Sequence, residues 1–210
     1  DDAFAYCDSL TSIEIPKSLE EAGSNHFYYG ATGVFTGCIS LETVTFEAGT
    51  TKVVDHLFMD CTGIKKIKIP DTVNEIGENA FENCSNLKTV ETENGIEIIG
   101  HRAFAECVQI NEIKIPDGVT QLGNNVFGGC IRLEEITVPN SVSEIGDSIF
   151  ANCTDLTKVD LSDALTEITY GLFDNCVSLT SIKIPNSVKE IDDNAFRNCD
   201  ALTSITIPDS

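Results

Sequence analysis

The 210-residue sequence has no tryptophan, one methionine and few basic residues: 13 Lys and Arg face 34 Asp and Glu, for a formal net charge of −21. Nucleic acids and anionic membranes require a basic footprint, so this charge disfavours both as partners. No apolar run reaches the roughly 18 residues of a membrane span, which predicts no membrane insertion. No charged start followed by an apolar segment marks a signal peptide.

Signals for catalysis or metal binding are also scarce. The three histidines, His26, His56 and His101, stand at different offsets from their nearest cysteines, so no catalytic order of Ser, His and Asp can be defined. No C-x-x-C or H-x-x-x-H motif offers a zinc site. The acidic turn at 192–194 lacks the spacing of a calcium loop and indicates a solvated turn. We therefore predict no enzymatic activity, no cofactor and no metal.

The sequence consists almost entirely of one internal repeat. The motif F-x-x-C occurs nine times, and from Cys38 onward each Cys follows the last by 23 residues, whereas the first interval is 31. A fixed period of this size predicts a solenoid, because each unit is too small to bury its apolar face alone. The nine motifs begin at Phe4, Phe35, Phe58, Phe81, Phe104, Phe127, Phe150, Phe173 and Phe196.

The pattern after each Cys predicts one strand per repeat. Leu or Ile stands three residues later, and mostly aliphatic residues six and eight later alternate with polar ones, as in a half-buried strand. Pro follows in six units and ends the strand. A V-x-x-I-G segment then returns on the opposite side, with Gly77, Gly100, Gly123 and Gly146 at a bend. A short helical or 3₁₀ turn is expected to carry each Phe into the core.

The nine cysteines are predicted to be reduced. They occupy the same position in successive coils, and strands in a sheet lie about 4.8 Å apart. A disulfide needs Cβ atoms closer, near about 3.8 Å. An odd-numbered ladder of this kind cannot pair completely, so we interpret the thiols as small apolar core residues.

The repeat resembles the leucine-rich repeat, and most closely its BspA-like branch, also called the Treponema-type repeat. The pattern A-F-x-x-C-x-x-L-x-x-I-x-I-P-x-S-V-x-x-I-G is reproduced almost fully at 126–146 and 195–207. The chain departs from it around residues 20–33. It departs again at Glu47, Glu93 and Ser162, where Pro is missing.

The resemblance implies a curved leucine-rich-repeat solenoid of about eight 23-residue repeats, with a parallel β-sheet on the concave face. Residues 1–210 would form a single domain, a fragment of a longer protein. Members of this branch are mostly surface or secreted proteins of bacteria, associated with adhesion that includes host matrix proteins. The resemblance thus implies a non-enzymatic binding module at the cell surface or secreted.

The outward strand positions, four, five and seven residues after each Cys, provide the first candidate binding surface. These 27 positions hold seven Lys, seven Asp or Glu, twelve Ser or Thr and one Asn, so the surface is neutral and the rest of the chain carries the whole charge of −21. The densest basic cluster comprises Lys65, Lys66, Lys68, Lys88 and Lys114. It suits an acidic loop or a sulfated glycan; alternatively, Glu91 and Glu112 neutralise it as cross-strand pairs.

The second candidate is the insertion at 20–33, about eight residues longer than the standard repeat, which contains His26, Phe27, Tyr28 and Tyr29. Aromatic residues on a loop are favoured interface anchors. Alternatively, these rings fold back to complete an irregular coil. Two rival functions stay open: a structural spacer that presents another domain, or carbohydrate binding through this aromatic insertion.

Overall fold

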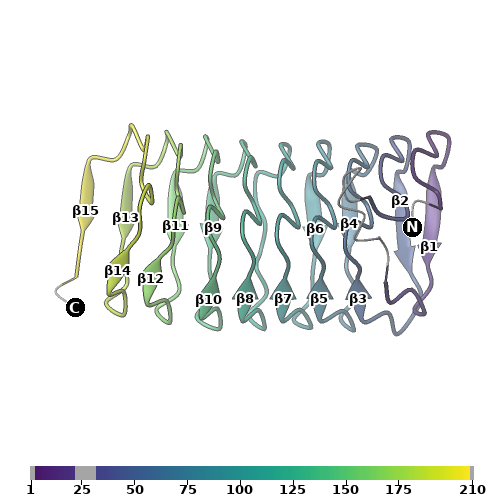
Figure 1. Cartoon of the computed structure of the whole chain (residues 1–210), viewed down its shortest axis with the longest axis horizontal. Coiled ribbons are helices and arrows are strands. Elements are labelled where there is room, and N and C mark those ends of the chain that lie inside the picture. Colours follow the sequence, from purple (N-terminus) through teal and green to yellow (C-terminus); the bar gives the residue numbers. More distant parts are fainter. Residues whose placement is uncertain (1–2, 22–31, 209–210) are drawn as a thin grey trace.

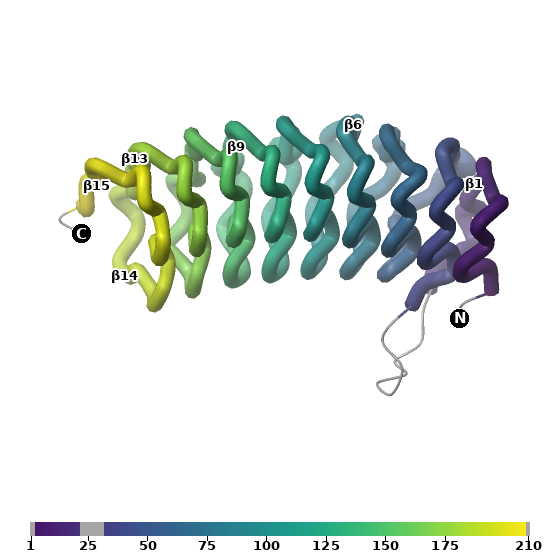
Figure 2. The backbone as a smooth tube through the Cα atoms, turned by 90° about the horizontal axis from the view of Figure 1, so that it is seen from above, coloured from purple at the N-terminus to yellow at the C-terminus, as the bar shows by residue number. Residues whose placement is uncertain are grey.

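The computed structural model describes residues 3–21 and 32–208. The chain winds into successive coils that stack along one axis, with its two ends at opposite ends of the stack (Figure 1). Seen from above, the coils follow a gently curved row (Figure 2). This is the repeat solenoid that the 23-residue period predicts.

Each complete coil carries two strands on opposite sides of the core, except the coil that follows Cys107, where residues 111–115 stand in place of the long strand. The long strands are β1 (Ser12–Ile15), β2 (Thr43–Phe46), β4 (Lys66–Lys68), β6 (Thr89–Glu91), β9 (Glu135–Thr137), β11 (Lys158–Asp160), β13 (Ser181–Lys183) and β15 (Ser204–Thr206). The short strands are β3 (Lys52–Val53), β5 (Glu75–Ile76), β7 (Ile98–Ile99), β8 (Gln121–Leu122), β10 (Glu144–Ile145), β12 (Glu167–Ile168) and β14 (Glu190–Ile191). Every pairing is parallel, as in Lys66 opposite Thr89, so equivalent residues of successive coils stand side by side.

A column of phenylalanine rings fills the core between the two rows of strands. The nine rings form eight stacked pairs with centroids 5.3 to 6.1 Å apart. The six rings from Phe58 to Phe173 are fully buried, whereas Phe4 in the first coil is 50% exposed. The leucines and isoleucines three residues after each Cys pack against this column.

The turn that carries each Phe differs from the sequence prediction. The described residues form no helix. Instead, tight turns join Phe to Cys, as where the Cys61 amide donates to the Phe58 carbonyl at 3.1 Å. The residue before each of the nine cysteines has a left-handed φ, among them Asp60, Asn83 and Gly129. That conformation stops helix propagation, and Asn, Asp and Gly tolerate it best.

The repeated glycines at the bend serve close approach. Gly77, Gly100, Gly123 and Gly146 are not left-handed. A Cβ atom on Gly123 would lie 2.5 Å from the amide nitrogen of His101 in the preceding coil, and similar contacts occur at the other three. Thr169 takes this position in a later coil, where its hydroxyl donates to the Gly146 carbonyl at 2.8 Å.

The cysteines form a second column, and all nine are free thiols, which confirms the sequence prediction. Each Sγ from Cys38 onward donates to the carbonyl of the Phe in the preceding coil at 3.0 to 3.2 Å. The thiol is therefore a hydrogen-bond donor between coils as well as a small apolar residue, a role that the sequence reading missed. Burial raises the pKa of Cys61 and of Cys130 to about 12, which keeps both protonated as donors.

The row of long strands is divided into separate sheets. Strands pair as β1–β2, β4–β6, β9–β11 and β13–β15, and residues 111–115 join β9 only through a bridge between Glu112 and Glu135. The breaks therefore follow β2, β6 and β11. These are the rungs that lack the strand-ending Pro, with Glu47, Glu93 and Ser162 in its place. Each of these strands still pairs with the rung before it, as where the Glu47 amide donates to the Ile15 carbonyl at 2.8 Å, so the break lies only on the side of the following rung.

Candidate functional site: a groove on the long-strand face

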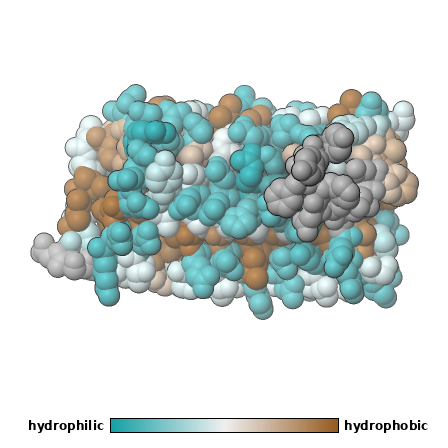
Figure 3. Space-filling view, in the orientation of Figure 1, coloured by the Kyte–Doolittle hydropathy of each residue, from teal (hydrophilic) through white to brown (hydrophobic). Residues whose placement is uncertain are grey.

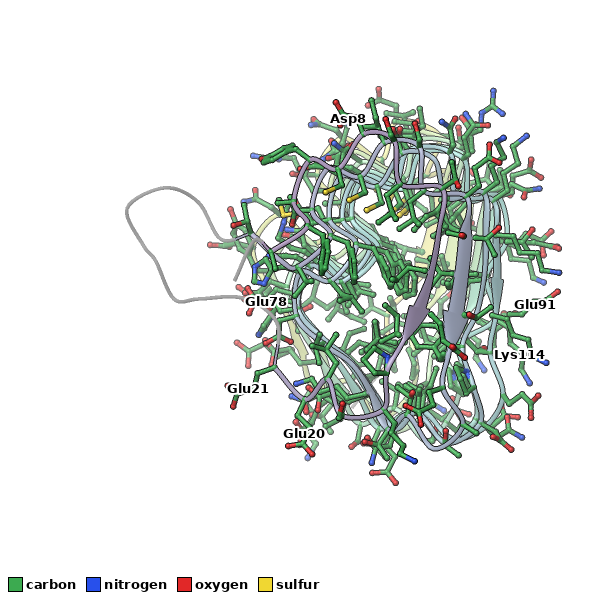
Figure 4. The ribbon with its side chains drawn as sticks, turned by 90° about the vertical axis from the view of Figure 1, so that its right-hand side faces the viewer. Asp8, Glu20, Glu21, Glu78, Glu91 and Lys114 are labelled. Carbon is green, nitrogen blue, oxygen red and sulfur yellow. The ribbon has the colours of Figure 1, made fainter. Side chains whose placement is uncertain are left out.

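We call the outward surface of the long strands the long-strand face. Figure 4 shows Glu91 and Lys114 pointing away from the core on this side, and Glu78 on the opposite side. A groove of about 770 Å³ lies on this face, where the ladder opens after β6. Four successive rungs line it: residues 88–90, 111–117 in part, 135–139 in part, and Lys158 with Asp160.

The floor of the groove is apolar. Val90 and Ile113 occupy the position six residues after their cysteines, and both are only partly buried. Residues at the same position in neighbouring rungs, Ile67, Ile136 and Val159, are 1%, 4% and 5% exposed. At the two ends of the stack this position is also partly buried or exposed, at Ile13, Val44 and Ile205, but in the middle of the stack only the two rungs beside this break leave it partly exposed.

The rim of the groove is charged and only loosely paired. Lys114 lies 3.6 Å from Asp117, with both side chains about 70% exposed, and Lys158 lies 3.5 Å from Glu135. Such exposed pairs contribute little free energy, so a partner can displace them. Among the residues that the structure describes, Lys88 forms no ion pair.

The groove separates the lysines that the sequence grouped together. Lys88 and Lys114 line it, whereas Lys65, Lys66 and Lys68 stand on the rung before it. Lys66 pairs with Glu91 at 2.6 Å, as the cross-strand alternative expects. Lys65 pairs with Glu42 at 3.4 Å, while within the described ranges Lys68 has no ion pair.

The aromatic insertion and the groove remain to be compared with the sequence analysis. His26, Phe27, Tyr28 and Tyr29 lie outside the described residues, so the aromatic insertion stays a prediction. The groove itself was not predicted, although its signal was visible in the sequence: Thr92 and Glu93 replace the Ile-Pro found in other units.

The face of the molecule seen in Figure 3 is largely hydrophilic. Figure 3 shows hydrophilic side chains over much of one face, with apolar atoms gathered at the end where the last coils lie. There Ile205 and Ile207 are exposed. Over residues 3–21 and 32–208, no three His, Cys, Asp or Glu side chains come together as a metal site would require. The same ranges contain no helix long and apolar enough to cross a membrane.

Parallel strands repeated every 23 residues around one apolar core place the chain in the class of leucine-rich-repeat solenoids. Its sequence matches the family described as BspA type Leucine rich repeat region, in six copies, over residues 1–134 and 120–210. The chain belongs to this family. No protein with a curated description matches it.

Solved structures agree with this assignment. A leucine-rich repeat protein from Bacteroides ovatus is 32% identical, with a TM-score of 0.74, over 94% of this chain and 46% of that one. The leucine-rich repeat protein of T. pallidum is 26% identical, with a TM-score of 0.72, over 91% of this chain and 83% of that one. The pneumococcal vaccine antigen PcpA, at 18% identity and a TM-score of 0.54, shares the fold. The chain thus spans less than half the length of the Bacteroides protein.

Proposed function

We propose that the chain is a non-enzymatic binding module of a cell-surface or secreted bacterial protein, and that it adheres to a host or partner protein through the long-strand face. The groove after β6 carries this proposal, because it combines a partly exposed apolar floor with loosely paired charges. The residues that dominate the binding energy of an interface typically lie in an apolar centre of this kind, from which water is easily excluded. Membership of the BspA-type family supports a binding role.

The charge distribution favours this face over the others. Its 27 outward positions hold equal numbers of lysines and carboxylates, while the rest of the chain carries the net charge of −21. An acidic partner is repelled by the remainder of the surface and meets the least repulsion here. Charge therefore directs the approach of such a partner, and the apolar floor provides affinity.

Two double variants with matched charge changes test the proposal against immobilised fibronectin, fibrinogen, other matrix proteins and a glycan panel. Lys88→Glu/Lys114→Glu alters the groove, and Lys65→Glu/Lys68→Glu alters the rung beside it. Each pair combines one lysine that has an ion pair with one that has none among the described residues. The groove variant should lose at least about tenfold in affinity, or about 1.4 kcal/mol, and the control less than about threefold.

Three other outcomes would contradict this assignment. Equal losses in the two variants would mean that net charge, and not the groove, governs binding. Glycan binding unchanged in both variants but lost in Tyr28→Ser/Tyr29→Ser would assign carbohydrate recognition to the insertion. No saturable binding to any member of the panel would favour a spacer that presents another domain.

A further inference from the structure

We propose that the gap between β6 and residues 111–115 is an anchor pocket for one aliphatic side chain, presented by an extended segment of the partner polypeptide. This inference rests on the proposed function and makes it specific. The pocket is the part of the long-strand face that would select the partner, and an aliphatic side chain is the group that it would select.

The break in pairing lies only on the long-strand side. No backbone pairing joins β6 to residues 111–115 on that side. On the opposite side the same coils stay in register, since β5, β7 and β8 pair continuously. In the core, Phe81 and Phe104 stack with centroids 5.3 Å apart. The coils are therefore held together behind the break, and the partly exposed Val90 and Ile113 can be reached without separating them.

The lining selects an aliphatic group over a sugar. Val90 and Ile113 form the floor, and no aromatic side chain lines the groove on which a sugar ring could stack. Both residues are β-branched and partly exposed, so a Leu, Ile or Val from a partner would restore the burial that neighbouring rungs achieve internally. The lining holds three lysines and four carboxylates. Lys88 is the lysine among them that has no ion pair among the described residues, so it is the group that can pair with a carboxylate beside the anchor.

The sequence shows how the pocket can be closed. The preceding unit ends its strand with Ile69 and Pro70, whereas this unit has Thr92 and Glu93. Thr92→Ile/Glu93→Pro should extend the strand end, join β6 to the next rung and bury Val90 and Ile113. Because the change restores the consensus of the other coils, the melting temperature should stay equal or rise. Phe46→Ile/Glu47→Pro makes the same sequence change at the break after β2, away from the groove, and serves as the control for peptide affinity. It does not control for stability, because it also removes the bond from the Glu47 amide to the Ile15 carbonyl and the Lys17–Glu47 ion pair.

The probe is a displayed library of linear nine-residue peptides, selected on the wild-type protein. We expect enriched peptides to share one aliphatic residue with a neighbouring acid. Their affinity should fall at least about tenfold for the closed variant and stay within about twofold for the control. Ile113→Thr keeps a β-branched residue in the strand but makes the floor polar. It should weaken the same peptides at least about fivefold, even if the ladder stays open in the closed variant.

Failure of this inference is distinguishable from failure of the proposed function. Enrichment of peptides without an aliphatic residue, no enrichment at all, or unchanged affinity for Ile113→Thr would overturn the anchor pocket. If a matrix protein still distinguishes Lys88→Glu/Lys114→Glu from its matched control, the long-strand face would keep its binding role without the pocket.

Discussion

Replacement of Phe104 by alanine tests the packing on which the whole solenoid depends. The ring is 1% exposed and stacks on Phe81 at 5.3 Å and on Phe127 at 6.0 Å. Removing a fully buried ring costs about 3–5 kcal/mol through lost burial and the cavity left behind. Since the backbone ladders on both sides resist collapse of the coil, we expect a value of about 4 kcal/mol or more.

Phe4→Ala is the matched control for this prediction. Its ring belongs to the same column, but it is 50% exposed and has one stacking neighbour, Phe35, at 5.5 Å. The free energy gained by burial scales with the apolar area removed from water, so Phe4→Ala should lower the free energy of unfolding by only about 1–2 kcal/mol. Urea unfolding followed by circular dichroism measures both, with hydrogen exchange to detect partial unfolding of the repeats. A loss below about 1 kcal/mol for Phe104→Ala, or one equal to that of Phe4→Ala, would refute the column as the source of stability.

Two further predictions concern the thiol column and the left-handed turns. Because burial raises the pKa of Cys130 to about 12, the unfolded chain ionises this thiol first. Its contribution to stability is then complete below about pH 8.5 and falls by about 1.4 kcal/mol per pH unit above it. The free energy of unfolding, measured by urea titration, should fall less between pH 8 and pH 10 for Cys130→Ala than for the wild type. Equal falls would contradict the role of Cys130 as a buried, protonated hydrogen-bond donor. Asn152 has a φ of 63°, so Asn152→Val should lower the free energy of unfolding by about 1–2 kcal/mol, whereas Asn152→Gly should change it very little. Thermal melting compares the two variants, and similar melting temperatures would exclude backbone strain as the cause.

The fold could be predicted from the sequence because one period fixes every coil. A residue such as Cys107 repeats the environment of Cys84 and Cys130, so strand, core and thiol column all follow from a single alignment. The helical turn was wrong for a local reason. The left-handed position before each Cys is filled by Asn, Asp or Gly in seven coils, but Tyr6 and Glu106 obscure the pattern.

The groove depends on pairing between rungs, which no single repeat encodes. The missing prolines at Glu47, Glu93 and Ser162 mark where pairing stops, but only the structure shows that a groove with a partly exposed apolar floor forms at the break after β6. The lysines illustrate the same limit. Sequence spacing places Lys66 and Lys88 on neighbouring rungs, yet it does not show that Glu91 engages the first while the second lines the groove.

Hydrogen–deuterium exchange of the chain, free and saturated with the matrix protein that binds it, tests the central claim most directly. We expect slower exchange on binding at residues 88–92 and 111–117, with smaller changes along β9 and none along the short strands β3 to β14. Protection confined to the short strands, or to residues 22–31, would show that the partner binds elsewhere and would contradict recognition through the groove.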